Sequence, residues 1–168
     1  MAVKTQGTNL YCMNPDGGEI VDVGCVTAIS GIDSTLEEIE TTCLSANSRT
    51  YESGLDTPGT ANFTTQFDPE NPVHIQLFNW KKLGKTLVWA VGFRQQDAIE
   101  QGVDPDGPES TTDSNGDYIL DLPDTRSWIV FEGYMNSHPF DFQGNAVVTS
   151  NIGVRISGDI DVVPRTAS

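Results

Sequence analysis

The segment 111–122, Thr-Thr-Asp-Ser-Asn-Gly-Asp-Tyr-Ile-Leu-Asp-Leu, contains residue types that bind calcium. Asp113, Asn115 and Asp117 have the spacing of the first, third and fifth ligands of an EF-hand loop. The sixth position of that loop requires a glycine and here is a tyrosine, while the twelfth requires a glutamate and here is an aspartate. An Asn-Gly pair favours a tight turn, so we expect a turn in an acidic segment, followed by a short strand.

Other reactive residue types lack the spacing that catalysis or metal binding requires. His74 and His138 lie far apart in the sequence, with no cysteine or carboxylate at metal-ligand spacing beside them, and no Gly-x-Ser-x-Gly motif is present. Because the chain has 24 acidic residues, some carboxylates must lie close together by chance, so a carboxylate pair carries little weight. We therefore expect no catalytic residues, no metal, no cofactor and no enzymatic activity. An acidic calcium- or ligand-binding β-domain is the alternative.

The charge of the chain excludes one class of partner. Its 168 residues have a formal net charge of −15, and nine acids but no Lys or Arg lie between Asp97 and Asp124. Tight binding to a phosphate backbone needs clustered basic residues, so a nucleic-acid-binding protein of that kind is excluded. No apolar run is long enough for a membrane helix, and the N-terminus lacks a signal-peptide core, so we expect a single domain, 1–168, made in a cytoplasm.

The three cysteines are too few and too widely spaced for a disulfide framework or a zinc site. We expect Cys12, Cys25 and Cys43 to be buried free thiols. A bridge between Cys12 and Cys25 across neighbouring strands remains open.

Period-two alternation of apolar and polar residues predicts a mainly β protein. In 60–68, Ala61 and Phe63 face one way while Asn62 and Thr64 face the other, which is the pattern of a half-buried strand. The same pattern recurs in 86–94 and 146–157. Further strands are expected at 8–13, 19–29 and 127–135.

The segment 72–83 predicts one helix. Asn71 is a suitable N-cap, Pro72 suits the first helical position, and Gly84 supplies a C-terminal stop. Residues spaced at three and four positions form the inward stripe of this helix, namely Val73, Leu77 and Trp80, widened by Phe78 and Leu83.

Two long segments between the predicted strands, about 44–60 and 95–117, read as irregular loops. Loops of this length are uncommon in compact domains and usually have a function, so we expect them to contact something outside the domain. A short polar tail, 161–168, ends the chain.

The order of several motifs resembles a known family. A Gly-Leu-Asp-x-x-Gly motif at 54–59 precedes an alternating strand that ends in Asp-Pro, and a helix with His-x-x-Leu follows. The segment 131–137, Phe-Glu-Gly-Tyr-Met-Asn-Ser, then leads to one long closing strand. Together these motifs, over residues 8–160, resemble the major tail tube protein of lambda-like siphophages.

The resemblance implies a fold and an assembly. The fold would be two packed antiparallel sheets, a sandwich or barrel, flanked by one helix. Six subunits would form a ring in which the inner sheets join into one β-barrel, and rings would stack into the tube of a virion tail. The implied partners are other copies of the chain, the tape-measure protein in the lumen, the tail terminator and the tail-tip proteins, with no membrane and no specific binding of the DNA that passes through. The inner tube of a contractile tail or secretion-like apparatus is the closest alternative. The lambda protein has a second, immunoglobulin-like domain, for which we expect no counterpart in this chain.

The polar faces of the predicted strands supply candidates for the lumen. They are Asn62, Thr64, Gln66, Asp68, Thr149, Asn151 and Arg155. An acidic wall would repel phosphates, so DNA would pass without sticking. For contacts between rings, the candidates lie in the 44–60 loop and are Arg49, Tyr51, Leu55 and Asp56.

Overall fold

The computed structural model describes residues 2, 4–24 and 26–166, and within them the chain is mainly β. The strands are β1 Asn9–Asn14, β2 Glu19–Asp22, β3 Val26–Ser30, β4 Ser34–Glu40, β5 Tyr51–Pro58, β6 Thr60–Gln66, β7 Thr86–Gly92, β8 Glu109–Thr112, β9 Tyr118–Asp121, β10 Trp128–Ser137 and β11 Thr149–Val163. The helices are α1 Pro72–Leu83 and α2 Gln96–Glu100. The expected mainly β class is confirmed.

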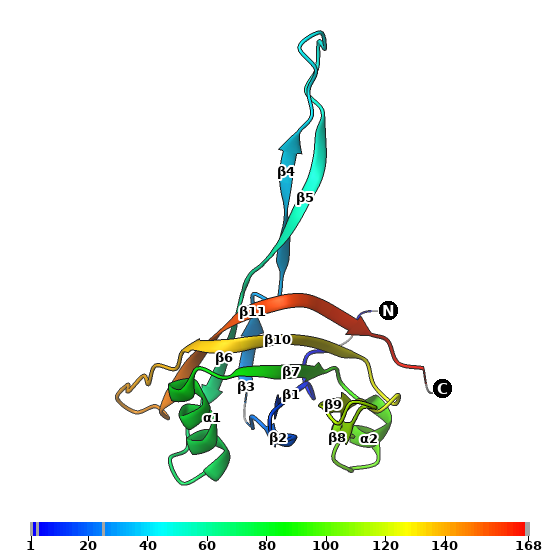
Figure 1. Cartoon of the computed structure of the whole chain (residues 1–168). Coiled ribbons are helices and arrows are strands. Elements are labelled where there is room, and N and C mark those ends of the chain that lie inside the picture. Colours follow the sequence, from blue (N-terminus) through cyan, green and yellow to red (C-terminus); the bar gives the residue numbers. More distant parts are fainter. Residues whose placement is uncertain (1, 3, 25, 167–168) are drawn as a thin grey trace.

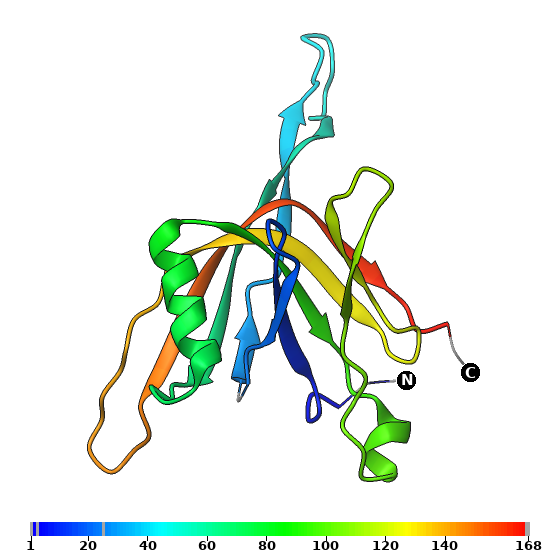
Figure 2. The ribbon, with the colours of Figure 1, turned by 60° about the horizontal axis from the view of Figure 1, so that its bottom comes forward.

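One antiparallel sheet of seven strands, in the order β2-β1-β7-β10-β11-β6-β3, forms the body of the protein (Figure 1). Its edge strands β2 and β3 are separated in the chain only by residues 23–25, so the sheet must curl until its two edges approach each other. The two expected layers are therefore two halves of one curled sheet, not separate sheets. Two-stranded sheets, β4-β5 and β8-β9, extend from this body (Figure 2).

The main core lies inside the curl and is covered at one end by α1. Phe63 of β6 stacks on Trp89 of β7 at 5.5 Å and on Phe131 of β10 at 6.3 Å between ring centroids, so the two halves of the sheet meet at aromatic rings. The Trp89 indole N–H donates to the carbonyl of Gly133 at 3.2 Å, which leaves no buried donor unpaired at this point.

Helix α1 forms where the sequence predicts it. Asn71 Oδ1 accepts from the amide of Val73 at 3.0 Å, and Gly84 ends the helix with a φ of 64°. Leu77 and Trp80 are buried and Val73 packs against the core, which confirms the inward stripe. Leu83 is 68% exposed, so its assignment to that stripe is wrong. It lies in the last turn, directly before the left-handed Gly84, and the buried face ends at Trp80.

His74 fixes the start of α1 against the sheet. Its Nδ1 accepts from the amide of Asp68 at 2.9 Å, and the protonated Nε2 donates to the carbonyl of Val23 at 3.2 Å. Its ring also stacks on Phe67. The histidine thus has a structural position in the core.

The strand predicted over 19–29 is wrong, because two strands form there, β2 and β3, at opposite edges of the sheet. Gly24 has a φ of 87°, a conformation that turns the chain out of one strand before the next begins. The Asp22 carboxylate accepts from the Gly24 amide at 2.9 Å and stabilises this turn. The strands predicted in 8–13, 60–68, 86–94, 127–135 and 146–157 are confirmed.

The two expected irregular loops contain regular structure. Eight residues of 44–60 form β5, which pairs with β4 in an antiparallel hairpin, and 95–117 contains α2 and β8. Short strands without a buried face lack the alternation that would have predicted them. The Asn-Gly turn is confirmed: it joins β8 to β9, with a φ of 89° at Gly116.

Two cysteines are described, and both are free thiols. Cys12 is buried, as expected, and burial raises the pKa of its thiol well above the usual value. Cys43 is exposed, so its predicted burial is wrong, because it lies at the solvent-exposed end of the β4-β5 hairpin. Cys25 lies outside the described residues. None of the helices described here is long and apolar enough to cross a membrane.

Candidate functional site: the assembly surfaces

A polar strip follows the strands β7, β10, β11 and β6 on the side of the sheet opposite the main core. Cross-strand pairs such as Thr64 with Asn151 and Gln66 with Thr149 place these side chains on one face. The strip consists of Asn62, Thr64, Gln66, Thr149, Asn151, Arg155, Ser157, Glu132, Tyr134 and Thr86. Six of the seven lumen candidates therefore share one surface, because period-two alternation holds along both strands.

Asp68 is the lumen candidate that lies outside this strip. Strand β6 ends at Gln66, and Asp68 sits in the turn before α1, where its carboxylate accepts from the amide of Glu70 at 2.9 Å. The alternation seen in the sequence ends before this residue.

Arg155 is the one base among the residues that define the strip. It is directly opposite Tyr134 of β10, and its Nη1 donates to Thr60 Oγ1 at 3.4 Å. Both Arg155 and Tyr134 are exposed, so a cation and a phenol are available on a polar surface whose other charged residue is Glu132.

Acidic side chains border one end of the strip, at a hollow of about 230 Å³. Two extra residues of β11 bulge out between its pairs with Val130 and Glu132 of β10. This bulge brings Asp159 and Asp161 to the same hollow as Glu132. Sequence reasoning missed these acids because β11 continues to Val163, beyond the segment whose alternation was recognised.

The β4-β5 hairpin with its connection 41–50, here called the arm, projects far from the sheet (Figures 1 and 2). Its large apolar side chains are exposed, with Leu55 at 80% and Leu44 wholly so. Leu36 and Tyr51 lie on one face of the hairpin and Ile39 on the other, as the cross-strand register requires. A two-stranded hairpin with no buried face is only marginally stable alone, so the arm is suited to be covered by a partner.

All four residues predicted to join rings lie on the arm. Tyr51, Leu55 and Asp56 belong to β5, and Arg49 lies in the connection before it. Arg49 Nε is 3.9 Å from Glu40 Oε1, and both side chains are at least half exposed. An exposed pair at this distance contributes little to stability, so Arg49 is available to a partner.

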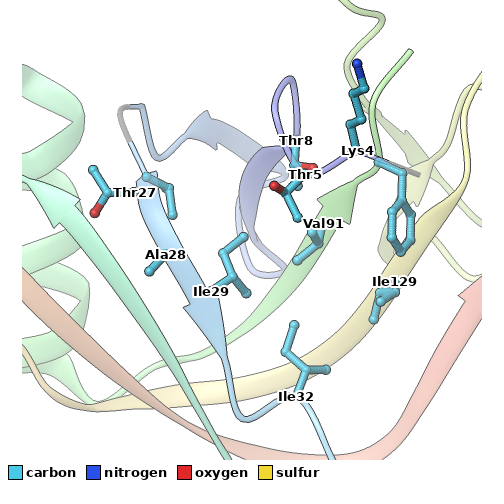
Figure 3. A pocket seen from close by; sticks show the side chains of 11 residues that line it. Lys4, Thr5, Thr8, Thr27, Ala28, Ile29, Ile32, Val91 and Ile129 are labelled. Carbon is cyan, nitrogen blue, oxygen red and sulfur yellow. The ribbon is translucent and has the colours of Figure 1, made fainter. Parts of the chain in front are cut away.

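An apolar groove of about 420 Å³ lies between the edge strand β3 and the strands β7 and β10 (Figure 3). Ile29 of β3, Val91 of β7 and Ile129 of β10 point into it from different strands (Figure 3). Lys4 lies at its rim and is the only charged residue among the described residues that line it. The groove offers apolar contact but no group for acid–base or metal chemistry.

The buried cation Arg126 lies just before β10 and fixes the start of this strand through hydrogen bonds. Its guanidinium donates to the carbonyls of Gly92 at 2.6 Å, Phe93 at 2.8 Å and Asp106 at 3.1 Å. It also donates to Asn9 Oδ1 at 3.2 Å. Burial lowers the pKa of Arg126, but four acceptors surround it, so its role is structural.

The acid next to Arg126 is held ionised. Hydrogen bonds from Thr125 and Gln95 lower the pKa of Asp106, and the positive charge of Arg126 lowers it further. The sequence analysis did not single out Arg126. The available signal was its position as the first basic residue after the acidic stretch from Asp97 to Asp124.

The Asp113 segment, considered for calcium, is a turn. Asp113 Oδ1 accepts from the amides of Asn115 at 2.8 Å and Asp117 at 3.0 Å. The described part of the chain contains no group of three or more His, Cys, Asp or Glu residues that could hold a metal ion.

Comparison with known proteins decides which assembly this is. The family model of lambda-like phage tail tube proteins (TTP) matches residues 1–166. The chain belongs to this family. It is also 46% identical over 166 residues to structural protein 3 of Pseudomonas phage PAJU2, a match that covers 99% of this chain and 96% of the relative.

Solved structures share the fold of this tail tube protein. The SPP1 tail tube protein aligns with a TM-score of 0.64 at 11% identity, over 97% of this chain and 80% of the other. A chain of a gene transfer agent tail, refined with C6 symmetry, aligns with a TM-score of 0.62 at 10% identity, over 99% and 100% of the two chains. An extracellular contractile injection system (PVC, sheath/tube terminator structure) contains a chain with a TM-score of 0.64 at 12% identity, over 96% of each. The protein is a structural subunit of a phage tail tube.

Proposed function

We propose that six copies of this tail tube protein close into a ring whose polar strips line a central channel. The strip is the observation that carries the proposal, because it is a mostly exposed and mostly uncharged polar face on β6, β11 and the adjoining part of β10. Rings then stack, the channel holds the tape-measure protein during assembly, and DNA passes through it at infection.

The free edge of β11 supports ring closure. From Ser157 onward, the pairing described for β11 is with β10 alone, because β6 pairs with it only up to Arg155. A long exposed edge normally promotes uncontrolled aggregation. In a closed ring, a neighbouring copy would satisfy this edge.

The chemistry of the strip suits the passage of a polyanion. Asn, Thr, Gln and Ser side chains offer DNA no clustered cations, and the hollow with Glu132, Asp159 and Asp161 adds negative charge beside the strip. Counterion release, which drives DNA binding to basic surfaces, would be absent. Arg155 and Tyr134 would form the one place along the strip with a cation.

The arm supports the stacking of rings. It extends away from the sheet and carries Arg49, Tyr51, Leu55 and Asp56 in exposed positions. Burial of its apolar side chains against another ring would stabilise both the arm and the tube.

Electron microscopy with accessibility labelling tests the proposal. In a Cys43→Ser background, Asn62→Cys places a thiol on the strip and Asn115→Cys places one in the exposed β8-β9 turn. We expect the purified protein to form tubes of sixfold rings, in which a bulky maleimide labels position 115 but not position 62. Rings that do not close, or equal labelling of both positions in intact tubes, would overturn the proposal.

A further inference from the structure

Helix α1 has an unusual outer surface. Ile75 is 43% and Leu83 68% exposed, on the side of the helix away from the buried Leu77 and Trp80. Surface helices usually present polar residues on that side, and exposed apolar clusters indicate a contact surface. The outer side of α1 therefore has the character of an interface.

The C-terminal end of α1 contains an unusual concentration of positive charge. Lys81, Lys82 and Lys85 are three of the nine basic residues of the chain. Lys85 pairs with Asp16 at 3.3 Å, whereas Lys82 is exposed and its Nζ lies 6.0 Å from the ring centre of Phe78. No carboxylate of the described residues lies within ion-pair distance of Lys81 or Lys82. Ile75, Lys82 and Leu83 are called the α1 patch below.

The arm has the opposite charge and the same apolar content. Its acids are Glu37, Glu38, Glu40, Glu52 and Asp56, against a single base, Arg49. Between them stand the exposed side chains of Leu36, Ile39 and Leu55. An acidic apolar surface and a basic apolar surface on one chain are complementary, which favours contact between copies.

We infer that the α1 patch of one copy is the surface that receives the arm of another copy. The arm rises from one side of the large sheet and α1 lies on the other (Figure 1), so an arm does not reach its own α1 patch. In a stack of rings each arm would dock on a copy in the next ring, so the contact is heterologous and repeats from ring to ring. This inference rests on the proposed stacking role of the arm and names its receptor.

Charge reversal on the α1 patch tests the docking. Lys82→Glu should raise the protein concentration needed for tube formation by about tenfold, because it turns attraction into repulsion and leaves buried groups untouched. Tube yield is measured by sedimentation and electron microscopy, and the fold by circular dichroism and thermal unfolding. Asn115→Asp with Gln143→Glu is the matched control, since both residues are exposed in loops outside the arm and the α1 patch and the change in net charge is the same. We expect this control to assemble like the wild type.

Compensating reversal on the arm makes the test specific. Glu38→Lys with Glu52→Lys places one lysine on each face of the hairpin, so rescue does not depend on which face docks. We expect the two arm substitutions to restore tube formation when they are combined with Lys82→Glu. They should not restore tube formation in a variant whose defect has another cause. Wild-type assembly by a folded Lys82→Glu, or the absence of rescue, would overturn the docking. Failure of the wild type to form tubes would instead contradict the proposed function.

Discussion

At the level of single residues, Arg126 is a charged side chain that is almost fully buried and closely surrounded. It is 1% exposed, and its guanidinium lies 4.9 Å from the ring centre of Trp128. A Cβ added at Gly92 would lie 2.7 Å from this guanidinium, so glycine is needed there for the close approach. One buried cation thus joins β1, β7, β10 and the segment before β8, and the planar fork of arginine reaches acceptors that a lysine could not satisfy together.

Replacing Arg126 by lysine should therefore destabilise the subunit. We expect Arg126→Lys to lower the free energy of unfolding by about 2–4 kcal/mol, because buried carbonyls lose their donors. Urea unfolding of unassembled protein measures the change. Arg155→Lys is the control, since Arg155 is exposed on the strip, and it should change the same quantity by less than about 0.5 kcal/mol. Equal losses in the two variants would show that the hydrogen-bonded fork is not what stabilises this region.

At the level of elements, the sequence predicted those with one buried face. Ala61, Phe63 and Thr65 alternate with polar neighbours because β6 separates the core from the strip, and the Leu77 and Trp80 spacing of α1 has the same cause. The alternation thus also predicted most of the strip. The arm has no buried face, so its strands left no periodic signal. The break between β2 and β3 at Gly24 depends on packing between residues far apart in the sequence. The sequence pattern therefore did not predict it either.

Both faces of the arm should matter for assembly. Leu36 is 62% and Ile39 53% exposed on opposite faces, so a single docking surface would leave one of them in water. We expect Leu36→Asp and Ile39→Asp each to raise the concentration for tube formation by about tenfold while thermal unfolding of the subunit is unchanged. Ile119→Asp, on the 45% exposed Ile119 of β9, is the matched control and should assemble normally. An effect confined to one arm variant would mean that the arm lies against one neighbour and is not enclosed between two.

At the level of the whole molecule, the position of charge matters more than its total. The formal charge of −15 was evident from composition, but the structure separates it into an acidic arm, an acidic β8-β9 hairpin and the hollow beside the strip. The strip itself contains one acid, Glu132, and one base, Arg155. The sequence could not place these charges, because their separation depends on how the curled sheet exposes its outer face. A channel lined in this way would exclude DNA from its wall by lack of cations more than by repulsion.

Adding cations to the strip should make the wall of the proposed channel bind DNA. Asn62→Lys with Asn151→Lys adds two bases per subunit on adjacent strands, at positions where exposed side chains leave the core unchanged. We expect the variant to form tubes that bind short duplex DNA at low salt and release it at high salt, with the bound DNA protected from nuclease because the tube encloses it. Asn115→Lys with Gln143→Lys adds the same charge to exposed loops and should bind DNA that remains open to nuclease. Nuclease-sensitive DNA on the strip variant would place the strip on the outside of the tube.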